Sequence, residues 1–180
     1  MKIHRQKSQF SSPWNFKKKL AILMWEWTWF LFCKWTPKNF NFWRLQILKL
    51  FGAKIYGNPF VHQRCIIQHP WNVCLHDKSC LGDQAVVYAL DTIEIHEQAI
   101  VAQEAYLCTG THDFNDDIRP LKTDTIIIGK NAFIGARAFI FPGIKIGNNA
   151  LVGACSVVTK NVPDNCKALG NPARFFNCDG

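Results

Sequence analysis

The sequence predicts an all-β fold, a parallel β-helix of about five coils, from three observations. Aliphatic residues recur every six positions through residues 125–163, small residues stand at the fifth place of most of these hexads, and the same phase continues upstream. A period of six is three times the strand period of two and no multiple of 3.6, so each hexad fits one short strand and a corner. Strands of an ordinary sandwich would not hold this phase for about a hundred residues. The predicted inward residues are Ile55, Val61, Ile67, Leu75, Leu81, Val87, Ile95, Val101, Leu107, Ile128, Ile134, Ile140, Ile146, Val152 and Val158.

The N-terminal segment, residues 1–52, is basic, rich in aromatic residues and predicted to be helical. The first 54 residues hold eleven of the 21 lysines and arginines but a single acidic residue, Glu26. Within the segment, Leu20 to Trp35 is long enough for four helical turns but shorter than the ~20 residues that span a bilayer. Two placements remain open. Residues 17–35 lie on a membrane surface with lysines on anionic lipid, or the helix packs on the end of the β-helix or on a neighbouring subunit.

Composition limits the partners and the compartment. The chain of 180 residues is long enough for one domain with one core. No nucleic-acid-binding signature accompanies the basic segment, so nucleic acid is not an expected partner. The eight cysteines show no CxxC pair and follow no secretory signal, so we expect mostly reduced cysteines and a cytoplasmic protein. Peripheral contact with the inner face of the cell membrane is compatible with that location.

The repeat domain, residues 53–174, is interrupted by a polar loop at 111–125 and followed by a short tail, 175–180. The interruption follows from the spacing of Leu107 and Ile128, which are twenty-one residues apart. His112 stands where the loop leaves the repeat. Reactive groups often lie on loops held by a rigid scaffold, and histidine changes charge near neutral pH. Asp113, together with Asp116 and Asp117, either orients the imidazole or is a solvated loop residue.

Five short motifs accompany the hexads. They are Trp43-Arg44 with Leu50 to Ile55 (WR…LFGAKI), His69 to Asn72 (HPWN), Cys108 to Asp113 (CTGTHD), Val157 to Pro163 (VVTKNVP) and Gly170 to Arg174 (GNPAR). Over roughly residues 37–174 the chain resembles the hexapeptide-repeat O-acetyltransferases, in particular the colanic-acid-type exopolysaccharide enzymes. The resemblance implies a left-handed β-helix, a homotrimer with acetyl-CoA in a groove between subunits, and a sugar hydroxyl of a cell-surface or exopolysaccharide precursor as acceptor.

The resemblance also implies roles for individual residues. His112 matches the general base, and no metal is required. Beside it, Asp113 is predicted as a second catalytic residue. Two departures from the family pattern affect the site. Tyr88 to Leu90 stand where related enzymes often carry an asparagine facing the acceptor, and Asn177 replaces a basic residue near the cofactor. The residues that match the acetyl-CoA path are Ala136, Ala154, Thr159, Lys160 and Arg174.

Three other functions remain as alternatives. Acetyl transfer to serine or to a xenobiotic would use the same machinery. A non-catalytic β-helix scaffold is disfavoured by the joint presence of His112, Lys160 and Arg174. A metal-dependent hydrolase would need a zinc site built around His76 and His96, which follow the first inward residues of adjacent coils; zinc requires further ligands nearby, and we expect no metal-ligating residues.

Overall fold

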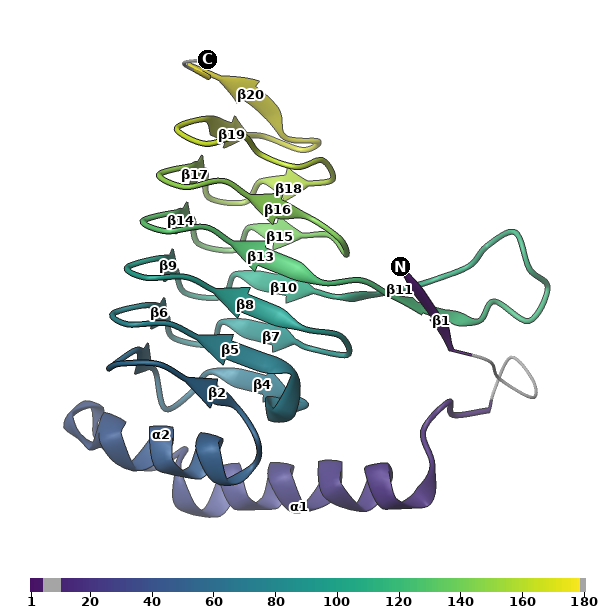
Figure 1. The fold of residues 1–180 in the computed structure, drawn as a ribbon, viewed down its shortest axis with the longest axis vertical. Helices are drawn as coiled ribbons and strands as arrows, with labels where there is room; N and C mark the ends of the chain where they lie inside the picture. The colour runs from purple at the N-terminus through teal and green to yellow at the C-terminus, as the bar shows by residue number, and fades with distance from the viewer. Residues whose placement is uncertain (5–10, 179–180) are drawn as a thin grey trace.

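The computed structural model describes residues 1–4 and 11–178, and it is a three-sided parallel β-helix standing on two helices (Figure 1). Residues 5–10 of the N-terminal segment and 179–180 of the tail lie outside the described residues. The first face contains β2 (Lys54–Ile55), β5 (Val73–Leu75), β8 (Ile93–Ile95), β13 (Ile126–Ile128) and β16 (Lys145–Ile146). The second contains β3 (Phe60–Val61), β6 (Cys80–Leu81), β9 (Ile100–Val101), β14 (Phe133–Ile134), β17 (Leu151–Val152), β19 (Lys167–Leu169) and β20 (Arg174–Phe176). The third contains β4 (Ile66–Gln68), β7 (Val86–Tyr88), β10 (Tyr106–Cys108), β15 (Phe139–Ile140) and β18 (Val157–Val158).

The hexad pattern correctly predicts the core. Of the fifteen predicted inward residues, all are buried except Ile55, which is partly buried at the helix-covered end. Parallel pairing joins each hexad to the corresponding hexad of the next coil; for example, Ile95 lies opposite Leu75 and Ile128. At some corners the next coil approaches closely, and a Cβ added at Gly135 would lie 2.5 Å from the backbone nitrogen of Ala154.

The β-helix has five complete coils, as the sequence predicts, and part of a sixth. After β18 the chain forms a parallel bridge between Val162 and Ile146 and then adds β19 to the second face. β20 turns back and pairs antiparallel with β19, so Phe175 and Phe176 belong to a terminal hairpin. Six of the eight cysteines are free, whereas Cys166 and Cys178 form a disulfide at this end.

Two helices close the other end of the β-helix. α1 (Phe16–Phe32) buries Trp25 and Trp29, and the indole N–H of Trp25 donates to the carbonyl of Ile67 at 2.6 Å. A short 3₁₀ turn, η1 (Lys38–Phe40), leads into α2 (Asn41–Leu50). Arg44 of α2 is fully buried and donates to the Val61, Pro37 and Lys38 carbonyls and to the Thr36 hydroxyl. One side of the predicted helix is therefore packed on the β-helix.

The extruded loop is a β-hairpin joined by the N-terminus. β11 (Gly110–His112) and β12 (Leu121–Thr123) pair antiparallel, and β1 (Lys2–His4) adds to the free side of β12. Figure 1 shows this small sheet projecting sideways from the stack of coils. The sequence suggested helices for residues 1–52, so β1 is an addition to that description. Its pairing partner, β12, lies more than a hundred residues away, so no local sequence pattern predicts this strand.

Candidate active site

His112 is the last residue of β11, two positions beyond Gly110, where the hairpin begins. Its imidazole is exposed, and Nδ1 lies 2.7 Å from the carbonyl oxygen of Arg119 across the hairpin. A carbonyl oxygen can only accept a hydrogen bond, so Nδ1 carries the proton in this contact. In the neutral ring the lone pair is therefore on Nε2. The hairpin holds His112 in the tautomer that a base acting through Nε2 needs.

Asp113 does not supply the contact that orients the ring. Successive strand residues point to opposite faces, so the two neighbouring side chains diverge. The Asp113 carboxylate instead lies 2.7 Å from Lys122 Nζ and accepts from the backbone N–H of Asn115. The hydrogen bond from Lys122, followed by that from Asn115, lowers the pKa of Asp113. Asp113 thus braces the hairpin, and the Arg119 carbonyl is the partner of the His112 Nδ1–H.

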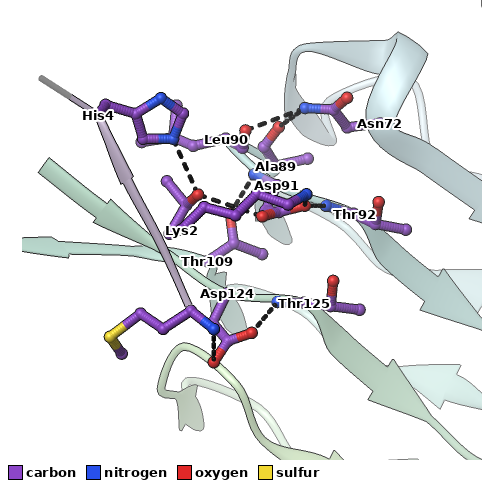
Figure 2. A network of polar contacts seen from close by, with 12 residues as sticks. Lys2, His4, Asn72, Ala89, Leu90, Asp91, Thr92, Thr109, Asp124 and Thr125 are labelled. Atoms are coloured by element: carbon purple, nitrogen blue, oxygen red, sulfur yellow. Dashed lines mark hydrogen bonds and ion pairs between the residues drawn. The ribbon is translucent and has the colours of Figure 1, made fainter. Parts of the chain in front are cut away.

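A buried carboxylate, Asp91, ties the foot of the hairpin to the third coil and to the N-terminus (Figure 2). It accepts from Lys2 Nζ at 2.9 Å, from the Thr92 N–H at 2.8 Å and from the Thr123 hydroxyl at 3.1 Å. The Asp91 N–H in turn donates to the hydroxyl of Thr109. Burial acts to raise the pKa of Asp91, but the hydrogen bonds from Lys2 and Thr92 hold it below its usual value. Sequence analysis missed this network, because Lys2 and Asp91 are 89 positions apart.

The predicted cofactor residues lie at two edges of the third face. We call the edge from which the His112 hairpin leaves the loop edge; Thr159 and Lys160 lie on it, directly after β18. Ala136 and Ala154 stack in successive coils at the other edge, where the Cys155 N–H donates to the Ala136 carbonyl at 2.8 Å. A corner at Cys155 and the strand β18 lie between Ala154 and Thr159. A single protomer thus brings Thr159 and Lys160, but not the two alanines, to the edge that carries His112.

Arg174, the fifth predicted cofactor residue, begins β20 in the terminal hairpin and is exposed. Its backbone pairs with Leu169 on the second face, in the partial sixth coil. The hydroxyl of Thr159 and the two cations, Lys160 and Arg174, that are predicted to meet the cofactor are all exposed. Charged nitrogens in this position suit the phosphates of a nucleotide.

The surface beside the hairpin is aromatic and apolar at the positions where the family pattern is broken. Ala89 and Leu90 are buried, and their carbonyls accept from the Asn72 amide at 2.8 and 3.1 Å. Tyr88 and Tyr106 are half-buried on the outer surface of the third face, with ring centroids 6.1 Å apart. Tyr106 also stacks on Phe139 at 5.0 Å. The side chains nearest the hairpin thus offer ring faces instead of an amide.

Comparison with known proteins gives the same grouping as the motifs. A family model described as "Hexapeptide repeat of succinyl-transferase" matches residues 125–160. An Escherichia coli K12 protein named "Putative colanic acid biosynthesis acetyltransferase WcaF" is 36% identical over 169 residues, which cover 92% of each chain. The galactoside O-acetyltransferase of the same strain is 35% identical over 88 residues, 47% of this chain and 43% of that protein.

Solved structures share the fold. The maltose O-acetyltransferase from Clostridium difficile 630 superposes with a TM-score of 0.78 at 26% identity, covering 90% of this chain and 88% of that one. A Vibrio cholerae hexapeptide-repeat acetyltransferase solved with acetyl coenzyme A has a TM-score of 0.81 at 18% identity, covering 93% and 91% of the two chains. The coils, the hairpin and a relative that matches nearly the whole length lead to one conclusion: the chain belongs to the hexapeptide-repeat O-acetyltransferase family and is an acyltransferase.

Proposed function

We propose that this enzyme transfers the acetyl group of acetyl-CoA to a hydroxyl of a sugar, with His112 as the general base. The observation that carries the proposal is the hydrogen bond from the exposed His112 ring, through Nδ1, to the Arg119 carbonyl, which in the neutral ring places the lone pair on Nε2. The names of relatives point to sugars: galactoside and maltose for two, and the polysaccharide colanic acid for a third. The half-buried rings of Tyr88 and Tyr106 offer an apolar platform for the carbon face of a pyranose.

The proposed reaction needs one base and no covalent enzyme intermediate. Nε2 of His112 removes the hydroxyl proton as the sugar oxygen attacks the thioester carbon. The Arg119 carbonyl stabilises the imidazolium that forms, through the Nδ1–H. The tetrahedral intermediate then collapses, the carbon–sulfur bond breaks, and the departing CoA sulfur takes the proton back from Nε2. The products are the sugar ester and free CoA thiol, and backbone N–H groups are the expected donors to the transient oxyanion.

The cofactor site is proposed to lie between subunits of a homotrimer. Ala136 and Ala154 are separated from Thr159 and Lys160 by the full width of one face, so a groove shared by two protomers is the simplest way to place both sets beside one cofactor. The second face supports association. It carries a column of exposed apolar residues from adjacent coils, Ile100, Phe133 and Leu151. Such a column is more typical of a protein interface than of a free surface.

Trimerisation can be tested by light scattering coupled to size exclusion. The native enzyme should have three times the mass of one chain. Phe133→Lys should shift it toward the monomer and weaken CoA binding, whereas Phe114→Lys, on an exposed residue of the hairpin, should leave the mass unchanged. A monomeric native protein that still binds CoA would contradict the shared site.

We also propose that α1 lies against the cytoplasmic membrane surface. The side of α1 that faces away from the β-helix is apolar: Leu20, Leu23, Met24, Trp27 and Leu31 are 47 to 57% exposed. Their spacing of three and four residues places them on one stripe of the helix. Lys17 to Lys19 lie at one end of the stripe and Lys34 at the other, positions that suit anionic headgroups. No helix among the described residues is long and apolar enough to cross a bilayer.

The membrane proposal predicts co-sedimentation with vesicles that contain phosphatidylglycerol and weaker binding to vesicles of phosphatidylcholine alone. The double variant Leu23→Glu with Trp27→Glu should abolish sedimentation, and Phe114→Glu should not. Retention of binding by the double variant would refute the role of the stripe. A membrane location would place the enzyme beside lipid-linked precursors of surface polysaccharide.

The central test measures CoA thiol release from acetyl-CoA with a panel of sugars, serine and a hydroxyl-bearing antibiotic. Sugar-dependent release that falls by about 10² or more in kcat in His112→Ala, with unchanged CoA binding, is the expected result. Asn115→Ala, in the same hairpin, serves as the control and should retain activity. Preference for serine or the antibiotic would refute the sugar acceptor. Activity of His112→Ala within a few-fold of the native enzyme would refute the base, and failure to bind CoA would favour the scaffold.

A further inference from the structure

On the first face, away from the proposed base, three side chains of different chemistry meet. Cys74 of β5, His76 directly after it and Glu94 of β8 place their ligand atoms within 4.8 Å of one another. Cys74 Sγ lies 3.6 Å from His76 Nε2, which lies 3.1 Å from Glu94 Oε1. We propose that these three residues bind a divalent transition-metal ion of the zinc class.

The separations of His76 Nε2 from Cys74 Sγ and from Glu94 Oε1 suit tetrahedral coordination. Zinc bonds of about 2.0–2.1 Å to nitrogen and oxygen and about 2.3 Å to sulfur give tetrahedron edges of about 3.3–3.6 Å. The two measured separations, 3.6 and 3.1 Å, are close to these edges. The β-helix register fixes this geometry, because Cys74 and Glu94 are direct neighbours in the parallel pairing of β5 and β8.

A second layer of contacts orients the imidazole. His76 Nδ1 lies 3.3 Å from Glu97 Oε1, so the ring can donate its Nδ1–H to a carboxylate while Nε2 faces the ion. Metal-binding histidines commonly have such a carboxylate partner. The His76 ring is stacked between Tyr56 at 4.9 Å and His96 at 4.8 Å. These neighbours hold the ring plane, which aims Nε2 between Cys74 and Glu94.

His96 acts on the carboxylate in this arrangement. Its ring is within 7° of parallel to that of His76, so the in-plane lone pairs of the two rings do not converge on one point. His96 Nε2 instead lies 3.5 Å from Glu94 Oε1 and positions that carboxylate. The fourth coordination position opens to a surface cavity of about 240 Å³ lined by Tyr56, Trp71 and Asn72, which leaves room for water.

Cys74 adds a buried sulfur to the two ion-pairing groups, because its Sγ lies against the ring of His76. Binding of the cation replaces the thiol proton, which is released to solvent, and forms a metal–thiolate bond. The ion then links the second and third coils. The site is separate from His112, and it departs from the expectation that the chain has no metal-ligating residues.

The test uses the full-length, tag-free protein, stripped with EDTA and kept reduced with a phosphine. Titration with Co²⁺ should produce one equivalent of a thiolate-to-cobalt charge-transfer band, which Zn²⁺ should abolish by displacement. Cys74→Ser should eliminate the band, and His76→Gln should weaken Co²⁺ binding at least tenfold. Cys80→Ser is the matched control, since Cys80 is a partly buried free cysteine on the adjacent second face.

Thermal unfolding provides a readout that does not depend on activity. Zn²⁺ should raise the midpoint of the native protein and of Cys80→Ser, but not that of Cys74→Ser. The proposal is overturned if the native protein gives no charge-transfer band and no midpoint shift, which would leave a histidine–carboxylate network only. A band that persists in Cys74→Ser would also overturn it, by assigning the metal to another thiol.

Discussion

The ion pair between Lys2 and Asp91 should stabilise the β11–β12 hairpin against local opening. Lys2→Met keeps the length of the side chain and removes its charge. Asp91 is 6% exposed, whereas the Lys2 side chain is 71% exposed, so the pair lies between an exposed pair and a buried one. Exposed pairs contribute about 0–1 kcal/mol, and breaking a buried pair costs about 3–5 kcal/mol. Because Thr92 and Thr123 continue to donate to Asp91, we expect a loss of about 1–2 kcal/mol.

Hydrogen exchange at the backbone amides of β12 measures this loss directly. A decrease of about 1–2 kcal/mol in the free energy of local opening corresponds to roughly 5- to 30-fold faster exchange. Lys49→Met, on an exposed lysine of α2, is the control and should leave β12 unchanged. The folded-state pKa of Asp91 is lowered, so its stabilisation is present above the unfolded pKa and is lost as the pH falls through the folded value. Lys2→Met should therefore also reduce acid sensitivity, and exchange within two-fold of the native rate would refute the reasoning.

Three further substitutions test the stability of the β-helix and of the helices that cover its end. Arg44→Met leaves four acceptors without their buried donor. It should lower the free energy of unfolding, measured by urea titration, by about 3 kcal/mol or more. Arg44→Lys should restore only part of this lost stability. Gly135→Ala forces a methyl group to within 2.5 Å of the Ala154 nitrogen and should cost about 1–3 kcal/mol in the same assay. Burial, then the charge of Lys18, lowers the pKa of His69 to about 4 from 6.5, so stability is complete above pH 6.5 and falls as the pH drops toward 4. His69→Asn, which tolerates the φ of 52° at this position, should flatten that dependence in urea midpoints measured across the window.

The fold could be predicted from the sequence because every coil of a β-helix repeats the same hexad pattern. Each inward residue, such as Ile134 or Val152, occupies an equivalent environment, and the error at any one hexad is corrected by the others. The partial sixth coil was less accessible, because Ala168 replaces the branched aliphatic residue that marks the earlier coils. β1 was inaccessible, since three residues with a distant partner carry no periodic signal.

The sequence identifies candidate site residues by the type and position of their side chains, but it does not show the contacts that orient them. His112 was identified from its position at the start of the loop, and in the structure it is the last residue of β11. The partner of its Nδ1–H was beyond the sequence, because the acceptor is a backbone carbonyl and any residue at position 119 supplies one. An acidic residue beside a histidine, such as Asp113, is a natural candidate to orient the ring. Because side chains alternate along a strand, its carboxylate instead contacts Lys122.

Surface chemistry on a β-helix becomes readable once the register of the coils is known. Coils two and three are offset by twenty residues, so Cys74 lies beside Glu94 and His76 beside His96, although each pair is distant in sequence. Sequence reasoning paired the two histidines but sought a third histidine as ligand. In the structure the rings of His76 and His96 stack nearly parallel, and the neighbouring column offers the sulfur of Cys74 and the carboxylate of Glu94 as ligands to the same imidazole. On this fold a metal site can therefore form on one face, from two residues of one coil that are two positions apart and a third residue of the next coil.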